Sequence, residues 1–344
     1  MIYYVLAIVV ILILIPIIVL AYLKKTEYKP HDIEDSRILR NNNSSKSKKT
    51  MRLTTLNIGY SSLDKKQDFF LEGGKGSRCV SKEKTSANLK GIVSMLKKID
   101  SDFYFLQEVD EPCRRSCYTN QVKFIVKRFN DYNSSFAYNY KVKYIPVPIF
   151  KPMGSAKSGL LTLSKFKILE SQRHQLKGDE SFPKRLFFLK RCMMVNKYKI
   201  NDKDKLILIN IHLSAYDKGG LIRKKQIEHL IEYINEVSKT NKHVIIGGDW
   251  NHLLDSSIYD KNMPDWVSIL PETLFESGYK IAYDKEVNTV RSEDTPYIKG
   301  QNFETIIDGF LVSPKVEITK VNTLDCEFEY TDHNPVTIFF KLKQ

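Results

Sequence analysis

The first 23 residues carry no charged side chain, and the run from Ile2 to Leu23 is almost wholly apolar apart from Pro16. A run of ~20 apolar residues is long enough to cross a bilayer as a helix. The chain start is not basic, and Leu23-Lys24-Lys25 lacks the small residues of a signal-peptidase site. The pattern therefore predicts a retained, single-pass transmembrane anchor over residues 1–23 rather than a cleaved signal peptide.

The following stretch, residues 24–50, is polar and ends in Asn41-Asn-Asn-Ser-Ser-Lys-Ser-Lys-Lys49. Its apolar content is too small for packing, so it is predicted to be a flexible tether. The positive charges near the span all follow it, at Lys24, Lys25, Lys29, Arg37 and Arg40. The positive-inside rule then favours, only slightly, a cytoplasmic location for the rest of the chain. An outward-facing hydrolase is the alternative, because a large domain can be exported despite such charges.

From Met51 onward the apolar pattern alternates between strand and helix periodicity. The residues from Met51 to Asn57 predict a strand, and Leu89, Ile92, Val93 and Leu96 form one face of a helix that precedes the buried run 103–106. Further strands are predicted at 160–164, 186–199, 205–212, 244–246, 306–312 and 336–342, with an amphipathic helix around 227–234. Helices among many strands indicate a mixed α/β domain over residues 51–344.

Charge and cysteine content narrow the picture only modestly. The formal charge is +14, from 54 Lys and Arg against 40 Asp and Glu, which favours polyanionic partners such as nucleic acid or acidic lipid. A Lys- and Asn-rich chain is basic whatever it binds, so this is weak evidence. The five cysteines are too few for a disulfide scaffold, and Cys113 with Cys117 lacks a second pair for zinc. We interpret them as ordinary thiols.

Polar residues able to bind metal stand where the predicted strands end. They are Asn57, Glu108, His212, Asp249 with Asn251, Asp308, and the pair Asp332-His333. Strand ends are where sheet-based enzymes assemble their sites. A set of carboxylates and carboxamides without cysteine favours Mg²⁺ or Mn²⁺ over zinc. One such residue alone is usually a solvated turn residue, so the prediction depends on the order of the whole set.

That order resembles the endonuclease/exonuclease/phosphatase superfamily. The resemblance is carried by Leu56-Asn57, Leu106-Gln-Glu108-Val109, Asn210-Ile-His212-Leu213, Gly248-Asp249-Trp-Asn251, Ile307-Asp308 and Thr331-Asp332-His333-Asn-Pro335. It covers the chain from about Met51 to the end. The chain also resembles a group of bacterial membrane-anchored members, at residues 26–30 and 157–164.

The resemblance implies a four-layer α/β/β/α sandwich of two mixed β-sheets with the site at one rim. It implies that Glu108 is the principal Mg²⁺ ligand, assisted by Asn57. Asp249 would orient or activate the attacking water, and Asn251 would hold the phosphate.

The two histidines receive their roles from the same resemblance. His333, steered by Asp332, would act as base or phosphate contact, and Asp308 would complete the polar cluster. His212 is a candidate general acid, although no carboxylate that would orient it can be identified. Thr331 stands where many members have Ser.

The chain is thus expected to be a membrane-anchored, metal-dependent phosphoesterase. Basic stretches such as Arg223-Lys-Lys225 and Lys184-Arg185 favour nucleic acid as substrate. The anchor and the polar-aromatic segment 138–150 favour a phospholipid, sphingomyelin or inositol-phosphate headgroup, and the two classes receive about equal weight. A catalytically inactive, anchored binding protein is a third alternative. The sequence makes no prediction about oligomeric state.

Overall fold

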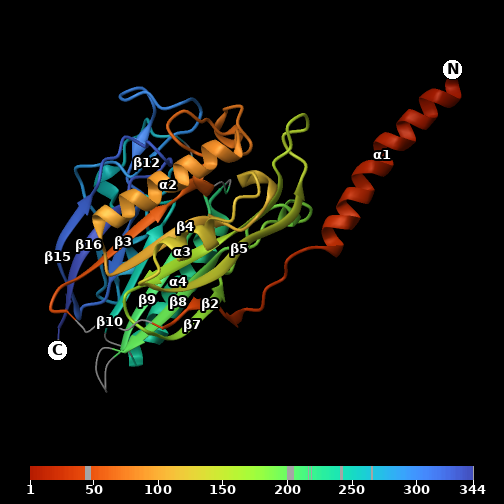
Figure 1. Ribbon diagram of the computed structural model, residues 1–344. Helices are drawn as coiled ribbons and strands as arrows, with labels where there is room; N and C mark the ends of the chain where they lie inside the picture. Colours follow the sequence, from red (N-terminus) through yellow and green to blue (C-terminus); the bar gives the residue numbers. More distant parts are fainter. Residues whose placement is uncertain are drawn as a thin grey trace.

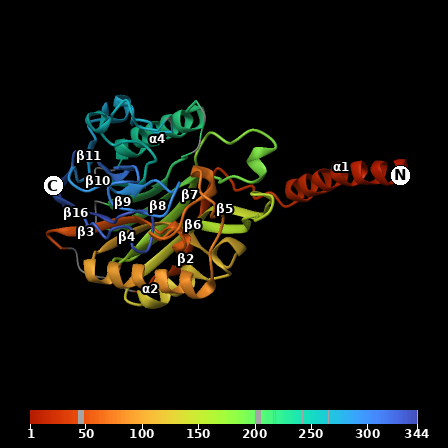
Figure 2. The same cartoon turned by 90° about the horizontal axis from the view of Figure 1, so that it is seen from above.

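The protein is described by a computed structural model that covers residues 1–42, 48–199, 205–215, 217, 219–240, 243–264 and 266–343. Two seven-stranded mixed sheets pack face to face, and helices cover their outer faces (Figures 1 and 2). The predicted four-layer α/β/β/α sandwich is confirmed. One long apolar helix precedes it.

The first sheet has the strand order β1-β7-β8-β9-β10-β14-β11. Its strands are β1 (Ile33–Asp35), β7 (Ile168–Gln175), β8 (Cys192–Lys199), β9 (Lys205–His212), β10 (His243–Asp249), β14 (Asp308–Val312) and β11 (Lys280–Ala282). Only the central β9 and β10 run parallel, and they are joined through α4 (Leu221–Thr240). Parallel strands are buried on both faces, which explains the unbroken apolar run from Leu206 to Ile209.

The second sheet has the order β15-β16-β3-β4-β6-β5-β2. Its strands are β15 (Val316–Thr323), β16 (Val336–Leu342), β3 (Met51–Asn57), β4 (Phe103–Asp110), β6 (Gly154–Ser164), β5 (Asn133–Ile145) and β2 (Arg37–Arg40). Here β3 and β4 are the parallel pair, connected by α2 (Lys82–Ile99). A separate short pair, β12 (Val290–Arg291) with β13 (Glu304–Thr305), lies above the rim.

The helices α2, α3 (Gln121–Arg128) and α4 pack on the outer faces of the sheets through their apolar stripes. Ile227, Leu230 and Ile234 of α4 pack on the outer face of the first sheet. The stripe of α2, together with α3, packs on the outer face of the second. Short 3₁₀ turns occupy Gly59–Ser61, Phe70–Glu72, Arg114–Ser116, Lys184–Leu186, Ser256–Ile258 and Glu272–Phe275.

The space between the sheets is filled by large apolar side chains. Phe103 and Phe105 of the second sheet meet Phe310 of the first, with aliphatic residues around them. Toward one rim of the sandwich the core becomes polar. There Gln107 donates to Asn210 across the two sheets at 2.8 Å. The paired amides therefore brace the sheets below the site.

The helix α1 (Ile2–Lys25) is long and apolar enough to span a membrane. It extends away from the sandwich as a separate rod (Figure 1). Its last turn nevertheless contacts the domain: Leu23 is buried in a cluster with Tyr60, Leu63 and Met153. The helix is thus attached to the domain without a spacer.

The prediction that residues 24–50 form an unpacked tether is wrong for residues 33–40. Residues Ile33–Asp35 add a strand to the edge of the first sheet, and Arg37–Arg40 adds one to the edge of the second. Edge strands are held by backbone hydrogen bonds, so a few apolar side chains suffice and composition does not reveal them. Part of the predicted tether, residues 43–47, lies outside the described residues.

The interpretation of the cysteines as ordinary thiols is also wrong in part. Cys79 and Cys117 form a disulfide. Cys113, Cys192 and Cys326 are free. The bonded pair is 38 residues apart in sequence and comes together only because the segment before α2 packs against the turn after β4.

Candidate active site

Three neighbouring strands of the first sheet place three of the predicted residues side by side. In the register of the sheet, Asp249 at the end of β10 pairs with His212 at the end of β9 and with Asp308 at the start of β14. Paired residues point to the same face of a sheet. The His212 Nε2 lies 3.3 Å from Asp249 Oδ2, and all three side chains are buried.

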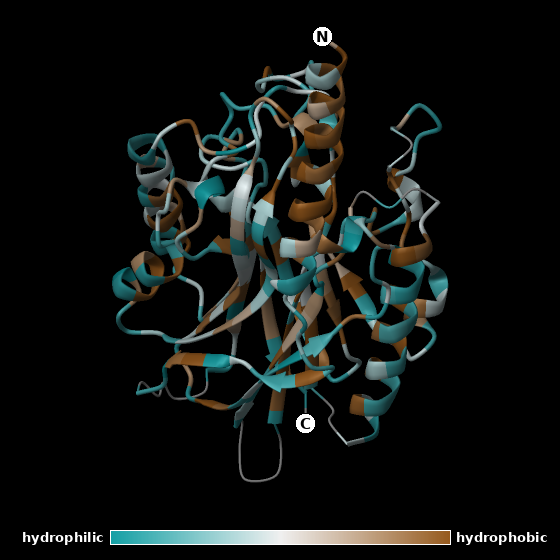
Figure 3. Cartoon of the chain, turned by 90° about the vertical axis from the view of Figure 1, so that its right-hand side faces the viewer, coloured by the Kyte–Doolittle hydropathy of each residue, from teal (hydrophilic) through white to brown (hydrophobic). Residues whose placement is uncertain are grey.

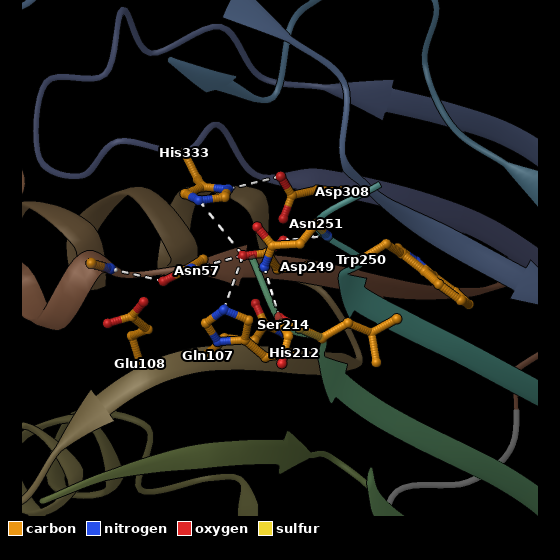
Figure 4. Close-up of polar contacts among 12 residues, drawn as sticks. Asn57, Gln107, Glu108, His212, Ser214, Asp249, Trp250, Asn251, Asp308 and His333 are labelled. Atoms are coloured by element: carbon orange, nitrogen blue, oxygen red, sulfur yellow. Dashed lines mark hydrogen bonds and ion pairs between the residues drawn. The ribbon is translucent and has the colours of Figure 1, made fainter. Parts of the chain in front are cut away.

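The second sheet contributes Asn57 and Glu108 from the ends of β3 and β4. The Asn57 side chain donates to Asp249 Oδ2 at 3.0 Å and accepts from the Gly59 amide at 3.0 Å. Glu108 adopts a φ of 54° where the register of β4 against β6 shifts. A bulge of this kind re-aims a side chain. Figure 4 shows the Glu108 carboxylate apart from the network around Asp249.

The structure gives His333 a closer partner than the predicted Asp332. Its Nδ1 lies 2.8 Å from Oδ2 of Asp308, the first residue of β14 (Figure 4). The Asp332 carboxylate is 3.6 Å from the other ring nitrogen and accepts from the Thr331 hydroxyl. The contact with Asp308 is at hydrogen-bond distance, whereas the longer contact with Asp332 is an ion pair without a hydrogen bond. Asp308 is therefore the residue that orients His333.

The segment Gly247–Asn251 is shaped by its glycines. A Cβ on Gly248, which has a φ of 145°, would lie 2.0 Å from the Ile211 carbonyl oxygen. Asn251 also has a positive φ, and its side chain donates to the Leu213 carbonyl at 2.8 Å. Its backbone amide donates to Asp249 Oδ1. Asn251 therefore fixes the carboxylate of Asp249, and its side-chain oxygen remains available to the cavity.

Burial dominates the electrostatics of Asp249 and His212. Burial raises the pKa of Asp249 to about 7, with Asp308 adding to the shift and His333 opposing it. Burial also holds the pKa of His212 well below its ordinary value, and the charges of Arg191 and His333 act in the same direction. His212 is therefore a neutral imidazole at neutral pH.

His333 has the opposite tendency. Burial opposes its charge, but the carboxylates of Asp308, Asp332 and Asp249 outweigh this and hold its pKa well above the ordinary value. The site thus pairs a charged and a neutral histidine around one carboxylate. Titratable groups whose pKa values are shifted in opposite directions are typical of sites for acid and base chemistry.

Sequence reasoning missed two arginines and a glutamate that line the same cavity. Arg115 is buried and contacts Glu108 at 3.1 Å and Asp110 at 2.8 Å. Arg191 is also buried and lies beside the His212 carbonyl. Glu293 is 4% exposed, and its Oε1 has no hydrogen-bond partner among the described residues. No motif signals them, because each lies in a loop or turn outside the strand-end motifs.

The donor set suits a hard cation. Asp249, Asp308 and His333 offer ligand atoms within 4.8 Å of one another. However, the bond between Asp308 and His333 places a proton on Nδ1, which competes with metal at that position. The cavity also contains Glu108, Glu293 and Asp332, and Asp308 Oδ1 is buried without a partner among the described residues. Clustered carboxylates with unsatisfied oxygens fit an oxygen-preferring ion such as Mg²⁺.

Asp249, His333, Glu108, Glu293 and Asp332 line the floor of a cavity of about 430 Å³. Its walls are largely apolar and come from loops: Leu63, Phe69, Phe70, Leu71, Ile145, Pro146, Val147, Met153, Phe187, Phe188 and Leu189. The basic stretches predicted to hold phosphates contribute little. Arg223 is buried, with its guanidinium bonded to the Trp266 and Asp217 carbonyls, and only Lys184 of the other stretch lines the cavity.

Comparison with known proteins agrees with this geometry. A model of the Endonuclease/Exonuclease/phosphatase family matches residues 78–333. The chain resembles an endonuclease/exonuclease/phosphatase from Beutenbergia cavernae, with a TM-score of 0.61 at 13% identity over 86% of this chain and 72% of that one. No curated protein matches the sequence.

Two further solved structures share the fold. D. rerio TDP2 complexed with single-strand DNA product has a TM-score of 0.56 at 16% identity, covering 86% of this chain and 100% of that one. The human Nocturnin catalytic domain with bound sulfate has a TM-score of 0.53 at 14% identity, covering 90% and 98%. The chain belongs to the Endonuclease/Exonuclease/phosphatase family. It is a phosphoesterase of that family with a buried group of Asp and His residues resembling a metal site.

Proposed function

We propose that the protein is a membrane-anchored, Mg²⁺-dependent phosphodiesterase. The observation that carries the proposal is the buried row of His212, Asp249 and Asp308, completed by His333 and facing Glu108 across one cavity. Hydrolysis forms a P–O bond from water and breaks the ester P–O bond. The water proton leaves, and a proton reaches the departing alcohol oxygen. The chain must therefore hold phosphate and move protons.

In this proposal Glu108 and Asn57 hold the ion, which neutralises charge on the phosphate when bound. Arg115 contacts the Glu108 carboxylate and fixes its position. Arg191 adds a buried positive charge near the phosphate. The acidic residues of the cavity are otherwise an obstacle to an anionic substrate, so the proposal requires the cation.

Asp249 is the group that accepts a proton from water, because its raised pKa makes it a stronger base than an ordinary carboxylate. His333, charged and oriented by Asp308, is the better source of a proton for the leaving oxygen. The predicted general acid, His212, is neutral and suits a hydrogen-bond donor to phosphate. Asn251 orients Asp249 and leaves its side-chain oxygen toward substrate or water.

The experiment uses full-length protein in detergent with bis(p-nitrophenyl) phosphate, with Mg²⁺ and with chelator. Asp249→Asn should lower kcat by at least ~10³-fold, a loss typical for a group acting on the transition state. Asp131→Asn, at an exposed loop carboxylate, is the matched control and should retain full activity. Equal turnover by Asp249→Asn and wild type would exclude this proposal.

The substrate class is part of the proposal. The solved TDP2 complex with single-strand DNA product keeps nucleic acid as the second candidate. A polyanion, however, needs an extended basic groove, and the cavity instead has apolar walls and a floor in which carboxylates stand beside the buried Arg115 and Arg191. We therefore favour a phosphate ester with an apolar portion. Plasmid DNA cleaved in preference to lipid diesters would reverse this choice.

For membrane topology we propose an outward-facing domain, against the slight cytoplasmic preference of the flanking lysines. Disulfides persist in oxidising compartments and are rare in the cytosol, and Cys79 is bonded to Cys117. The resemblance to membrane-anchored bacterial members remains a prediction. External protease added to intact cells should remove the domain, whereas protection of the domain would support the cytoplasmic orientation.

A further inference from the structure

Apolar side chains are exposed at the edge of the domain from which α1 departs. The tip of the β5–β6 hairpin exposes Ile149, at 81%, and Phe150, which is fully exposed. Val147 on the same tip and Phe182 on the loop before the 3₁₀ turn at residue 184 are also exposed. We call these four residues the apolar edge. The hairpin and the loop project on the side of α1 in both views (Figures 1 and 2).

The end of α1 is packed beside this edge. Leu23 belongs to one apolar cluster with Ile145 and Met153, which lie at the base of the hairpin tip. The ~20 residues that a helix needs to cross the hydrocarbon layer all precede Leu23 in the sequence. Without a spacer, the domain surface around the last turn of α1 therefore lies against the bilayer. Figure 3 shows that α1 is coloured as hydrophobic along most of its length.

The apolar edge is continuous with the wall of the catalytic cavity. Val147 is 42% exposed and also lines the cavity, and Leu71 is 45% exposed and does the same. Ile145 and Met153 are shared between the α1 cluster and the cavity wall. An apolar path therefore leads from the membrane-facing surface to the floor that holds Asp249.

Charge fits the same orientation. Lys143 and Lys151 stand on either side of the hairpin tip in the sequence, Lys24 and Lys25 follow Leu23 in the last turn of α1, and all four are exposed. Aromatic and aliphatic side chains surrounded by lysines are typical of surfaces that lie at the membrane interface. A soluble partner would meet the same surface only by displacing the bilayer that α1 holds there.

We propose that the apolar edge inserts into the interfacial layer of the bilayer that holds α1. The catalytic cavity then opens onto the headgroup layer and takes as substrate a phosphate ester with an apolar tail. The phosphate reaches the polar floor, and the tail remains against the apolar wall. This inference rests on the proposed phosphodiesterase function of the same site and names its substrate class.

The test uses full-length protein reconstituted in vesicles of phosphatidylcholine, phosphatidylethanolamine, phosphatidylglycerol, phosphatidylinositol and sphingomyelin. Release of phosphorylated or free headgroup and hydrolysis of soluble bis(p-nitrophenyl) phosphate are measured in the same sample. The double variant Ile149→Ser/Phe150→Ser should lower lipid hydrolysis by at least ~10-fold and leave the soluble diester unchanged. Leu169→Ser is the matched control and should change neither rate.

Leu169 suits this purpose because it is 49% exposed at the opposite end of the first sheet. Its neighbour Ile168 pairs with Tyr198, which pairs with Leu206 at the start of β9, whereas His212 ends that strand. A second measurement covers the case in which the double variant misfolds. The fluorescence of the tryptophan introduced by Phe150→Trp should be quenched by brominated lipids, whereas that of Leu169→Trp should not.

The outcomes distinguish failure of the membrane-insertion inference from failure of the proposed phosphodiesterase function. Asp249-dependent hydrolysis of the soluble diester or of plasmid DNA, without hydrolysis of any lipid, would overturn the inference and leave a phosphodiesterase. Equal lipid turnover by wild type and the double variant, or equal quenching at positions 150 and 169, would also overturn the inference. No Asp249-dependent hydrolysis of any substrate would overturn the proposed function itself.

Discussion

The floor and the mouth of the catalytic cavity are built in different ways. The floor is made of residues at strand ends, buried and held by register, with Asp249 receiving contacts from Asn57, His212 and the Asn251 amide. The mouth is made of loops and the base of a hairpin, and the tip of that hairpin exposes Ile149 and Phe150. Rigid strand ends suit chemistry, which tolerates little displacement, and loops suit the choice of substrate. Variants of the floor should therefore change turnover of every substrate.

Among the variants that probe metal binding, pH dependence and stability, the largest effect is expected from loss of the proposed metal ligand. Glu108→Gln keeps the shape of the side chain but removes its charge, so the Mg²⁺ concentration for half-maximal hydrolysis should rise on the order of 100-fold. Titration of Mg²⁺ against a soluble diester measures this. Glu228→Gln, on the exposed face of α4, should leave the titration unchanged. An unchanged Mg²⁺ requirement in Glu108→Gln would indicate that Asp249, Asp308 and His333 bind the ion instead.

The second effect distinguishes the two carboxylates near His333. Asp308 accepts the ring proton at 2.8 Å and raises the pKa of His333 more than Asp332 does. A raised pKa keeps the ring charged to higher pH. Loss of the carboxylate in Asp308→Asn should therefore move the alkaline limb of the pH–rate profile to lower pH by about one unit. Asp332→Asn should move it less. A larger shift in Asp332→Asn would restore Asp332 as the orienting residue.

The smallest effect concerns the stability of the floor. The pKa of Asp249 is raised to about 7, so the folded state holds a proton that the unfolded chain releases near the ordinary carboxyl value. The stability contributed by that proton is present at low pH and is lost as pH rises through about 7. Asp249→Asn does not titrate there.

Chemical unfolding of the full chain in detergent with chelator tests this difference. Between about pH 5 and pH 8 the wild type should lose on the order of 2 kcal/mol more stability than Asp249→Asn. Asp131→Asn, at the exposed loop, should follow the wild type. Parallel pH dependence of wild type and Asp249→Asn would mean that the carboxylate is solvated rather than buried. In that case ionising the carboxylate in the floor would cost no more stability than ionising a carboxylate on the surface.

The sequence by itself determined the apolar N-terminal helix, the fold class and the set of polar residues at strand ends. Each depends on a local pattern, because periodicity along the chain selects helix or strand and strand ends are marked by the first polar residue. The stripe from Leu89 to Leu96 and the apolar run from Leu206 to Ile209 lie as predicted in α2 and β9. The order of motifs was sufficient to indicate the family.

Only the tertiary structure decided which of these residues meet. The pairing of Asp308 with His333 joins positions 25 apart, and the disulfide joins Cys79 to Cys117 across two loops. The edge strands within the supposed tether depend on backbone bonds to distant partners, and Arg115 and Arg191 reach the site from segments with no motif. Such contacts depend on strand register and loop packing, which no local pattern of side chains records.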